Sequence, residues 1–124
     1  MGARSAIEPA ESPHIETMLA GVFDKLIQDG AFPVRSLVPR RTFWEKAMLL
    51  HEESYRPAGK PRRARLSRHY YDLWCLITKG IAAEAAHDMA LFERVAVHRQ
   101  GFFRYGWMDY TTLRTARAAT GCRR

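Results

Sequence analysis

The chain has 124 residues, of which 20 are Lys or Arg and 13 are Asp or Glu, so its formal net charge at pH 7 is +7. This length corresponds to one compact domain and excludes a two-domain enzyme. Hydrophobic residues make up 47% of the sequence, which excludes a chain that is disordered throughout. The positive charge is carried mostly by arginine, whose planar fork suits partners that present phosphate or carboxylate groups.

Neither a disulfide framework nor a targeting segment is indicated. The two cysteines, Cys75 and Cys122, form no CxxC pair, which argues against a zinc knuckle. The first residues lack an apolar signal core, and no apolar run approaches the roughly 20 residues that cross a bilayer. We therefore expect a cytoplasmic chain that does not contact a membrane.

The first predicted element is a helix that follows a flexible lead over residues 1–12. Ser12 suits the N-cap, Pro13 suits the first helical position and Gly30 suits the end of the helix. The helix is predicted because apolar residues recur at spacings of three and four. These residues are Ile15, Met18, Leu19, Val22, Phe23, Leu26 and Ile27.

A short strand, a second helix and a loop are predicted next. Residues 32–38 are punctuated by proline and suit an edge strand or an extended connector. Thr42 and Glu45 form a capping box, so the second helix is expected to begin there and to run to about Tyr55, where a proline follows two residues later. Residues 56–68 contain two prolines and no acidic residue, which predicts an exposed basic loop.

Two further helices complete the predicted fold. A helix over residues 67–79, capped by its first serine, has apolar residues on almost every side and is expected to be largely buried. A helix over residues 81–98 has one apolar stripe and is expected to pack on the preceding helix. Residues 111–124 are small and basic without periodicity, which is typical of a disordered tail. The helical region is therefore expected to span residues 13–110.

Two charged residues stand out because they lie on apolar parts of predicted helices. Lys46 falls on an apolar flank of the second helix, and Asp72 lies inside the most hydrophobic helix. Because a buried charge is costly unless it is paired or bound to a ligand, we expect these two side chains to contact each other. Arg68, at i−4 on the same helix, is an alternative partner for Asp72. Both a structural ion pair and a functional site fit this pattern.

The remaining polar residues match no catalytic or metal-binding motif. The five histidines do not have the spacing of a zinc or di-iron site, and no metal-ligating residue is predicted. The sequence contains no GxSxG elbow and no glycine-rich phosphate loop. His69 is retained as a candidate because it shares a helix face with Asp72.

The arginines of the basic loop have two interpretations. Positive charge before a helix N-terminus attracts phosphate, which favours binding of a nucleotide or RNA, whereas an ordinary solvated loop has the same composition. The candidate phosphate-binding residues are Arg62, Arg63, Arg65 and Arg68. Nearby aromatic residues are more typical of a core than of a base-stacking platform: Tyr70, Tyr71 and Trp74.

The order of short sequence blocks in the middle of the chain resembles one protein family. The blocks are RTFWEKA from Arg41, LLHEE from Leu49, RP at Arg56 and SRHYYDL from Ser67. Over residues 32–107 they resemble nucleotidyltransferase toxins of the AbiEii type, which belong to type IV toxin–antitoxin systems and act in abortive infection against phage. The resemblance implies that Lys46 and Asp72 belong to the active site.

The resemblance also implies a reaction and its requirements. A polymerase-β-like nucleotidyltransferase transfers a nucleotide from an NTP to RNA or another acceptor, and Lys46 would contact the phosphates while Asp72 orients the lysine or the acceptor. Glu45 and His69 are candidates for supporting positions. A full-length relative is expected to need Mg²⁺, an NTP and a cognate antitoxin. The acidic metal-binding pair of the family lies before the lysine helix, and no such segment occurs before Pro39.

We therefore expect a mainly α fold, namely the helical C-terminal portion of an α+β polymerase-β-like nucleotidyltransferase with one short edge strand. The chain is expected to be a truncated toxin fragment that holds no cofactor and is inactive alone. Two alternatives stay open. One is a small basic helical module that binds RNA through the loop arginines, and the other is a half-enzyme that complements a separate N-terminal catalytic half.

Overall fold

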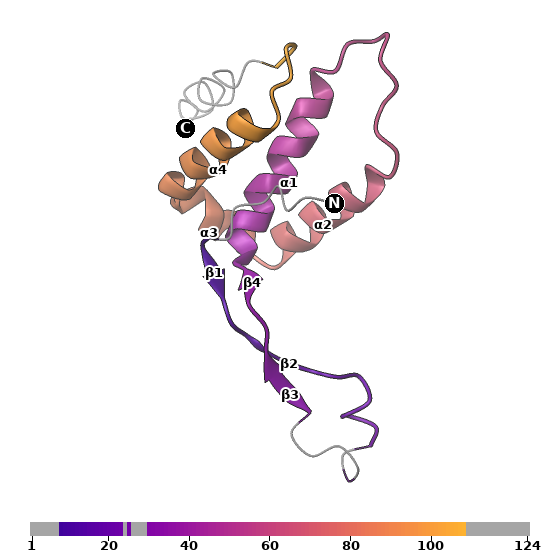
Figure 1. Cartoon of the computed structure of the whole chain (residues 1–124), viewed down its shortest axis with the longest axis vertical. Helices are drawn as coiled ribbons and strands as arrows, with labels where there is room; N and C mark the ends of the chain where they lie inside the picture. The colour runs from indigo at the N-terminus through magenta and orange to yellow at the C-terminus, as the bar shows by residue number, and fades with distance from the viewer. Residues whose placement is uncertain (1–7, 24, 26–29, 109–124) are drawn as a thin grey trace. The chain divides into compact units, whose positions relative to one another are not determined.

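The computed structural model describes residues 8–23, 25 and 30–108 (Figure 1). These residues form two units, one ending at Val38 and one beginning at Pro39, and each is described by itself. The predicted tail over residues 111–124 and most of the lead over residues 1–12 lie outside the described residues. In the parts of the chain that are described, helices dominate, which agrees with the mainly α fold expected from the sequence.

The first unit contains short antiparallel strands. β1 (Ala10–Glu11) pairs with β4 (Ser36–Leu37), and β2 (His14–Glu16) pairs with β3 (Ala31–Pro33). The register places Ile15 opposite Phe32 in the longer pair. The single strand predicted over residues 32–38 is therefore present as parts of two strands, each with its own partner.

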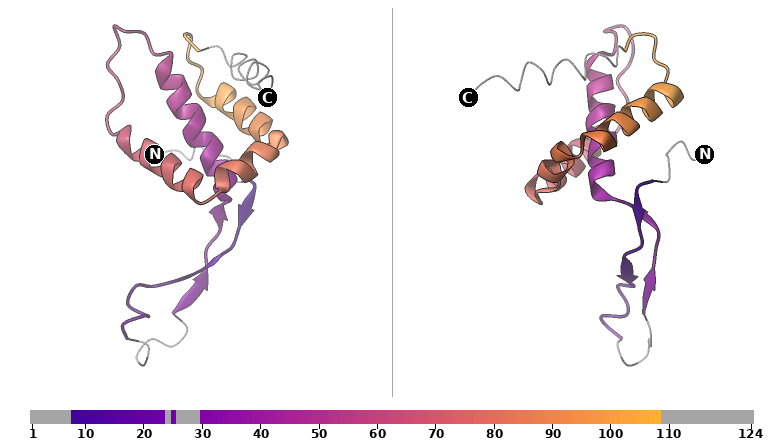
Figure 2. Two further views of the ribbon diagram at one scale, coloured as in Figure 1. Left: turned by 180° about the vertical axis from the view of Figure 1, so that it is seen from behind. Right: turned by 90° about the vertical axis from the view of Figure 1, so that its left-hand side faces the viewer.

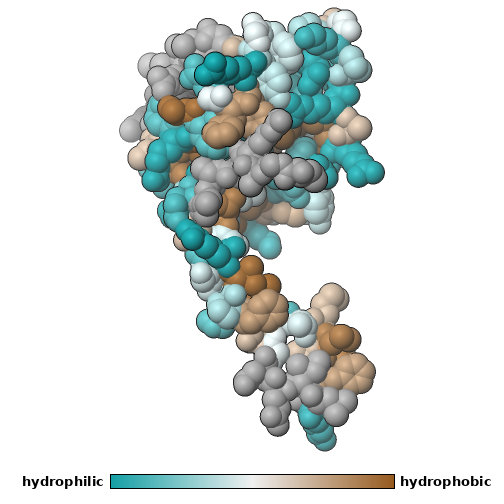
Figure 3. All heavy atoms as spheres, in the orientation of Figure 1, coloured by the Kyte–Doolittle hydropathy of each residue, from teal (hydrophilic) through white to brown (hydrophobic). Residues whose placement is uncertain are grey.

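The helix predicted between Ser12 and Gly30 is wrong for the described residues. Ile15 lies in β2, and residues 18–22 form turns. None of the described residues of this unit is buried, and Met18 is 94% exposed. Figure 3 shows hydrophobic residues at the surface of this part of the chain. Because a short helix depends on packing of its apolar face, the spacing of apolar residues was insufficient here. Leu26 and Ile27 lie outside the described residues.

The second unit is built from helices that contact one central helix. The helices are α1 (Pro39–Ser54), α2 (Ser67–Thr78), α3 (Ile81–His87) and α4 (Met89–Phe102). α1 contacts each of the other three. Both Figure 1 and the rear view in Figure 2 show α1 between α2 and α4. This arrangement makes α1 the element that positions side chains against all its neighbours.

α1 begins earlier than the capping box predicted. Pro39 is its first residue, which fits a position where no backbone N–H is required. Thr42 therefore lies within the helix instead of capping it. The Glu45 carboxylate accepts a hydrogen bond from Arg41 Nε at 3.0 Å. Glu45 thus pairs with a neighbouring side chain one turn away, and the predicted capping role is wrong.

The core of the helical unit lies between α1 and α4. Its buried side chains are Met48, Leu91, Phe92, Val95 and Ala96. Trp44 packs against this cluster, with its ring centroid 4.9 Å from that of Phe92, and its Nε1 donates to the carbonyl oxygen of Ala85 at 3.2 Å. The apolar stripe predicted for residues 81–98 is therefore confirmed as a core-facing surface.

The stretch predicted as one helix over residues 81–98 is two helices. The break falls at Asp88, whose backbone has φ −99° and ψ 75° and is not helical. Its carboxylate oxygen Oδ1 accepts a hydrogen bond from the Leu91 backbone N–H at 3.0 Å, which caps α4. The expected packing of this region on α2 is confirmed by the contact between α2 and α3.

α2 differs from the predicted buried helix. It begins at Ser67 as expected, but its N-cap is Leu66 and no side chain caps it. Gly80, with φ 78°, follows its end and starts α3, a conformation that favours glycine. None of the residues of α2 is buried, so the prediction of a largely buried helix is wrong. One side packs on α1 and α3, whereas the other side leaves apolar residues exposed.

Candidate functional site

α1 and α2 bring together the two charged residues that the sequence singled out. Lys46 Nζ donates a hydrogen bond to Asp72 Oδ2 at 2.7 Å, so the predicted contact is confirmed. The same Nζ lies 3.0 Å from His69 Nδ1. Because an ammonium group only donates, His69 Nδ1 acts as the acceptor and the imidazole proton lies on Nε2. Lys46 is therefore fixed between two groups of α2.

The charges of this site favour an ionised aspartate and a neutral histidine. The hydrogen bond from Lys46 lowers the pKa of Asp72, and the nearby charge of Arg68 contributes in the same direction. Burial lowers the pKa of His69, and the positive charge of Lys46 lowers it further. The side chains of Lys46 and Asp72 are 24% and 42% exposed, so a solute can reach this site from solvent.

The four candidate arginines are in different environments. Arg62, Arg65 and Arg68 are exposed. Arg63 is different, because its Nε lies 2.9 Å from Glu53 Oε1 and its guanidinium also donates to the Tyr105 hydroxyl. Arg63 is therefore paired with a carboxylate of α1, a contact that the sequence did not predict.

Arg65 has an additional distinguishing feature. Its φ is +62°, and it is the one non-glycine residue of the described ranges with a positive φ. A side chain with a Cβ adopts this left-handed conformation at a cost, and such residues are found more often where a particular conformation is needed. The strained residue lies at the end of the basic loop, two positions before α2.

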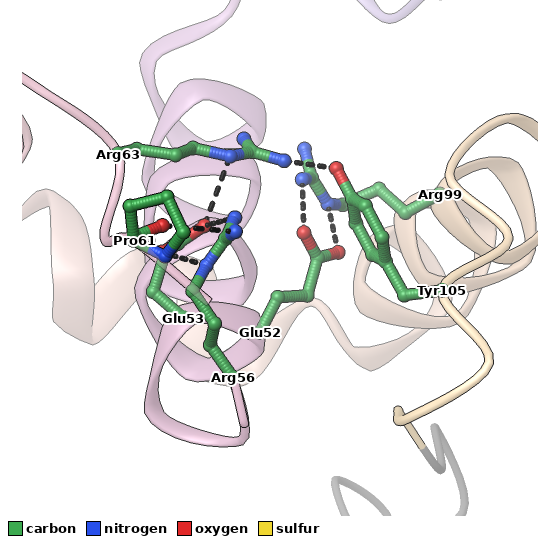
Figure 4. Close-up of polar contacts among 7 residues, drawn as sticks. All are labelled: Glu52, Glu53, Arg56, Pro61, Arg63, Arg99 and Tyr105. Atoms are coloured by element: carbon green, nitrogen blue, oxygen red, sulfur yellow. Dashed lines mark hydrogen bonds and ion pairs between the residues drawn. The ribbon is translucent and has the colours of Figure 1, made fainter. Parts of the chain in front are cut away.

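A second cluster of charges was not predicted. Figure 4 shows Glu52 of α1 facing Arg99 of α4. Arg99 donates to both carboxylate oxygens of Glu52, at 2.8 and 2.7 Å, and the side chains are only 7% and 2% exposed. One signal could have revealed this pair: Arg99 follows the buried Val95 by four residues and therefore lies on the core-facing stripe.

Glu53 holds the basic loop against the end of α1. It accepts hydrogen bonds from Arg56 at 2.8 and 2.6 Å, and Arg56 also donates to the Pro61 carbonyl oxygen at 3.3 Å (Figure 4). The hydrogen bond from Arg56 is the main cause of the lowered pKa of Glu53. On the far side of the loop, Lys60 Nζ lies 4.2 Å from the centroid of the Trp107 ring. These contacts give Arg56, Lys60 and Arg63 a structural role.

The described residues do not fit a divalent cation. They contain no group of three or more His, Cys, Asp or Glu side chains arranged to hold a metal ion. Asp72 and His69 both contact Lys46, and Glu52 and Glu53 bind arginines.

Comparison with known families identifies the class of protein. The model of the family described as "Nucleotidyl transferase AbiEii toxin, Type IV TA system" matches residues 1–120. The chain belongs to this family of nucleotidyltransferase toxins, and membership implies a cognate antitoxin. The match begins at residue 1, so it extends beyond residues 32–107, where the sequence blocks carry the resemblance. No curated protein and no solved structure matches the chain.

Among the residues that the structure describes, no helix combines the length and the apolar character needed to cross a bilayer.

Proposed function

We propose that the chain contributes a phosphate-binding site to nucleotidyl transfer, in which Lys46 contacts the phosphates of an NTP and Asp72 and His69 position its ammonium group. The observation that supports this proposal is the double contact of Lys46 Nζ, at 2.7 Å to Asp72 and 3.0 Å to His69. A flexible lysine that is held from two sides loses little additional conformational freedom when a ligand binds.

The geometry leaves one hydrogen-bond donor of Lys46 for a ligand. An ammonium group has three N–H donors, and the contacts with Asp72 and His69 account for two. A neutral His69 leaves the positive charge of Lys46 uncancelled on that side. The exposed Arg68 lies on the same helix and compensates the repulsion between Asp72 and an approaching phosphate. Fixed positive groups of this kind stabilise the charge that develops during phosphoryl transfer.

We propose in addition that this chain is the helical C-terminal portion of a polymerase-β-like enzyme and transfers no nucleotide by itself. The proposal is supported by the acidic side chains of the two charged clusters, which are paired with lysine or arginine: Asp72, Glu53 and Glu52. The acidic groups of the transfer reaction would then come from another segment. Arg62, Arg65 and Arg68 would guide the NTP or the acceptor electrostatically.

Nucleotide binding by the full chain tests the role of Lys46. We expect Lys46→Met to weaken binding of radiolabelled NTPs in equilibrium dialysis by about tenfold or more, because a charge-assisted hydrogen bond to phosphate is lost. Lys25→Met is the matched control, since Lys25 is exposed and belongs to the unit that ends at Val38. Equal affinity of Lys46→Met and the unmodified chain would contradict the proposal.

A transfer assay tests the lack of independent activity. The full chain is incubated with radiolabelled NTPs, Mg²⁺ and total RNA, and we expect no label in the RNA. Incorporation that depends on Mg²⁺ would show that the chain supplies its own metal site, and it would overturn the proposal of an incomplete enzyme while leaving the role of Lys46 intact.

A second candidate function is RNA binding without chemistry. It is favoured by the exposure of Arg62, Arg65 and Arg68. Arg63, in contrast, forms an ion pair with Glu53. RNA binding together with no detectable NTP binding would favour this candidate over the first.

A further inference from the structure

We propose that His69 is itself a phosphate ligand, whose Nε2–H group donates a hydrogen bond to one phosphate of an NTP while Lys46 contacts another. We call Lys46, Asp72 and His69 the lysine site. With two separate donors, this site selects a chain of linked phosphates over a single phosphate group. The inference rests on the proposed function and deepens it, because it adds a residue that touches the ligand and names the feature of the ligand that is selected.

The contact with Lys46 determines which ring nitrogen of His69 carries the hydrogen. Lys46 Nζ lies 3.0 Å from His69 Nδ1, and an ammonium group only donates, so Nδ1 accepts and Nε2 carries the hydrogen. Burial and the positive charge of Lys46 both lower the pKa of His69, so the ring is neutral near pH 7 and has a single N–H group. The donor that His69 offers to a ligand is therefore Nε2–H.

Nε2 of His69 is open to solvent and has no hydrogen-bond partner among the described residues. Within this part of the chain, the hydrogen-bond contact of the His69 ring is the one between Nδ1 and Lys46. His51 provides a contrast, because its Nε2 is buried and finds no partner among the described residues. Nε2 of His69 is not a buried atom of this kind, so its N–H group is a donor that a solute can reach.

The shape of the imidazole ring separates the donor of His69 from the donor of Lys46. The two ring nitrogens point in different directions, and Nδ1 points at Lys46 Nζ. Nε2–H therefore points away from the lysine, and a single phosphate group that accepts from Nζ does not also reach Nε2–H. A ligand that accepts from both donors has to extend past the ring, as the phosphate chain of an NTP does. A nucleoside monophosphate satisfies one of the two donors at most.

The charges that act on His69 also favour a ligand with several negative charges. Lys46 of α1, Arg68 of α2 and Arg63 of the basic loop are positive, whereas Asp72 of α2 is negative. Lys46 and Arg63 are each paired with a carboxylate, so the exposed Arg68 supplies the excess of positive charge. A site with excess positive charge attracts a polyphosphate more strongly than a monophosphate.

Two substitutions separate the roles of the two ring nitrogens. His69→Asn places an amide near the position of Nδ1, so it keeps an acceptor for Lys46 and lacks the outward donor. His69→Gln places an amide near the position of Nε2, so it keeps an outward donor and lacks the contact with Lys46. A residue that only positions Lys46 is replaced better by asparagine, whereas a residue that contacts phosphate is replaced better by glutamine.

Equilibrium dialysis of the full chain against radiolabelled ATP or AMP measures both roles. We expect His69→Asn to bind ATP about tenfold or more weakly, because a hydrogen bond to a charged group is lost, and to bind AMP as the unmodified chain does. His69→Gln should keep the preference for ATP over AMP. His14→Asn is the matched control, since His14 is exposed and belongs to the unit that ends at Val38. Circular dichroism verifies that each variant keeps its helix content.

NMR spectra of the histidine ring nitrogens in the ¹⁵N-labelled, unmodified chain give a second measurement. We expect the hydrogen of His69 on Nε2 in the free chain, and we expect its signal to shift more on addition of ATP than on addition of AMP. The signal that is missing from His69→Asn identifies the residue. A hydrogen on Nδ1 in the free chain would overturn the inference.

The dialysis results that would overturn the inference are unchanged ATP affinity in His69→Asn and equal loss of ATP and AMP affinity in that variant. Loss of ATP affinity in His69→Gln alone would also overturn it, because His69 would then act only by positioning Lys46. Failure of the proposed function is observed separately, since Lys46→Met would in that case bind ATP as tightly as the unmodified chain.

Discussion

Individual ionisable residues of the helical unit serve two different purposes. Glu52 and Arg99 are removed from water and satisfy each other through two hydrogen bonds. Lys46 and Asp72 form a pair that remains accessible to solvent. An exposed pair contributes little to stability, whereas a buried pair becomes costly when only one partner is removed. The first pair is therefore structural, and the second is available for a ligand.

Glu52 and Arg99 are expected to show strong non-additivity. Glu52→Leu or Arg99→Met alone should lower the free energy of unfolding by about 3–5 kcal/mol, because the other charge stays buried and loses the two hydrogen bonds of the pair. The free energy of unfolding should fall less in the double variant than in the more destabilised of the two single variants. Urea denaturation of the four proteins measures both effects.

A matched control for that comparison is Glu84→Gln, since Glu84 is exposed on α3. It should change the free energy of unfolding by less than about 0.5 kcal/mol. Additive losses in the double variant would show that Glu52 and Arg99 do not depend on each other.

The sequence contains enough information to predict one of these pairs. Lys46 and Asp72 each interrupt an apolar helix face, and this irregularity is visible without a structure. Glu52 belongs to the polar end of the block LLHEE and has the appearance of a solvated residue. Its burial depends on α4 packing beside α1, which local sequence does not specify.

Local sequence signals, such as capping residues, determine where some of the helices begin. The junction between α3 and α4 is an example, because the hydrogen bond from Leu91 N–H to Asp88 Oδ1 marks the start of a new helix. The apolar stripe continues through the junction from Ala85 to Phe92, which is why the periodicity alone indicated one helix.

Asp88 is expected to stabilise this junction as an N-cap. Asp88→Ala should lower the free energy of unfolding by about 1 kcal/mol, whereas Asp88→Asn should be close to unchanged because asparagine caps equally well. Urea denaturation, monitored by circular dichroism at 222 nm, distinguishes the two variants. Equal destabilisation by alanine and asparagine would indicate that the negative charge matters and not the cap.

Other elements escaped prediction because apolar periodicity does not say what a helix packs against. The pattern from Ile15 to Val22 fits a helix, but these described residues lie in a strand and turns and are exposed. α2 has apolar residues on nearly every side, yet α1 and α3 cover only part of it. Packing partners decide both outcomes, and they are a property of the whole chain.

The whole helical unit is expected to be sensitive to mild acid. Burial lowers the pKa of His51, His69 and His98 from the ordinary value of 6.5. The unfolded chain therefore takes up protons near pH 6.5 that the folded chain does not bind, so the free energy of unfolding falls as pH drops below about 6.5. The loss continues at lower pH, where Glu53 and Asp72, whose pKa values are lowered, become protonated.

Urea denaturation at several pH values between 7.5 and 5 measures how steeply the free energy of unfolding changes with pH. His69→Gln should reduce the dependence of stability on pH, because it removes one of the histidines whose pKa is lowered in the folded chain. A stability that rises on acidification from pH 7.5 would contradict the lowered pKa values of these partly buried histidines.

At the scale of the whole molecule, the protein family could be predicted from the sequence. Four sequence blocks were sufficient to indicate the AbiEii nucleotidyltransferase toxins, and the family match over residues 1–120 agrees. The division of the chain after Val38 was not predicted, because the expected helical region was drawn from residue 13 to residue 110 without a boundary.

At Arg65, the stability of the basic loop and its affinity for phosphate favour different residues. Its left-handed backbone is a conformation that glycine adopts without strain. A change to glycine would relieve that strain and, under the nucleic-acid proposal, would at the same time remove a positive charge that contacts phosphate. Selection for a more stable fold and selection for tighter binding therefore act in opposite directions at this position. A sequence that gains stability by replacing Arg65 with glycine loses affinity for phosphate.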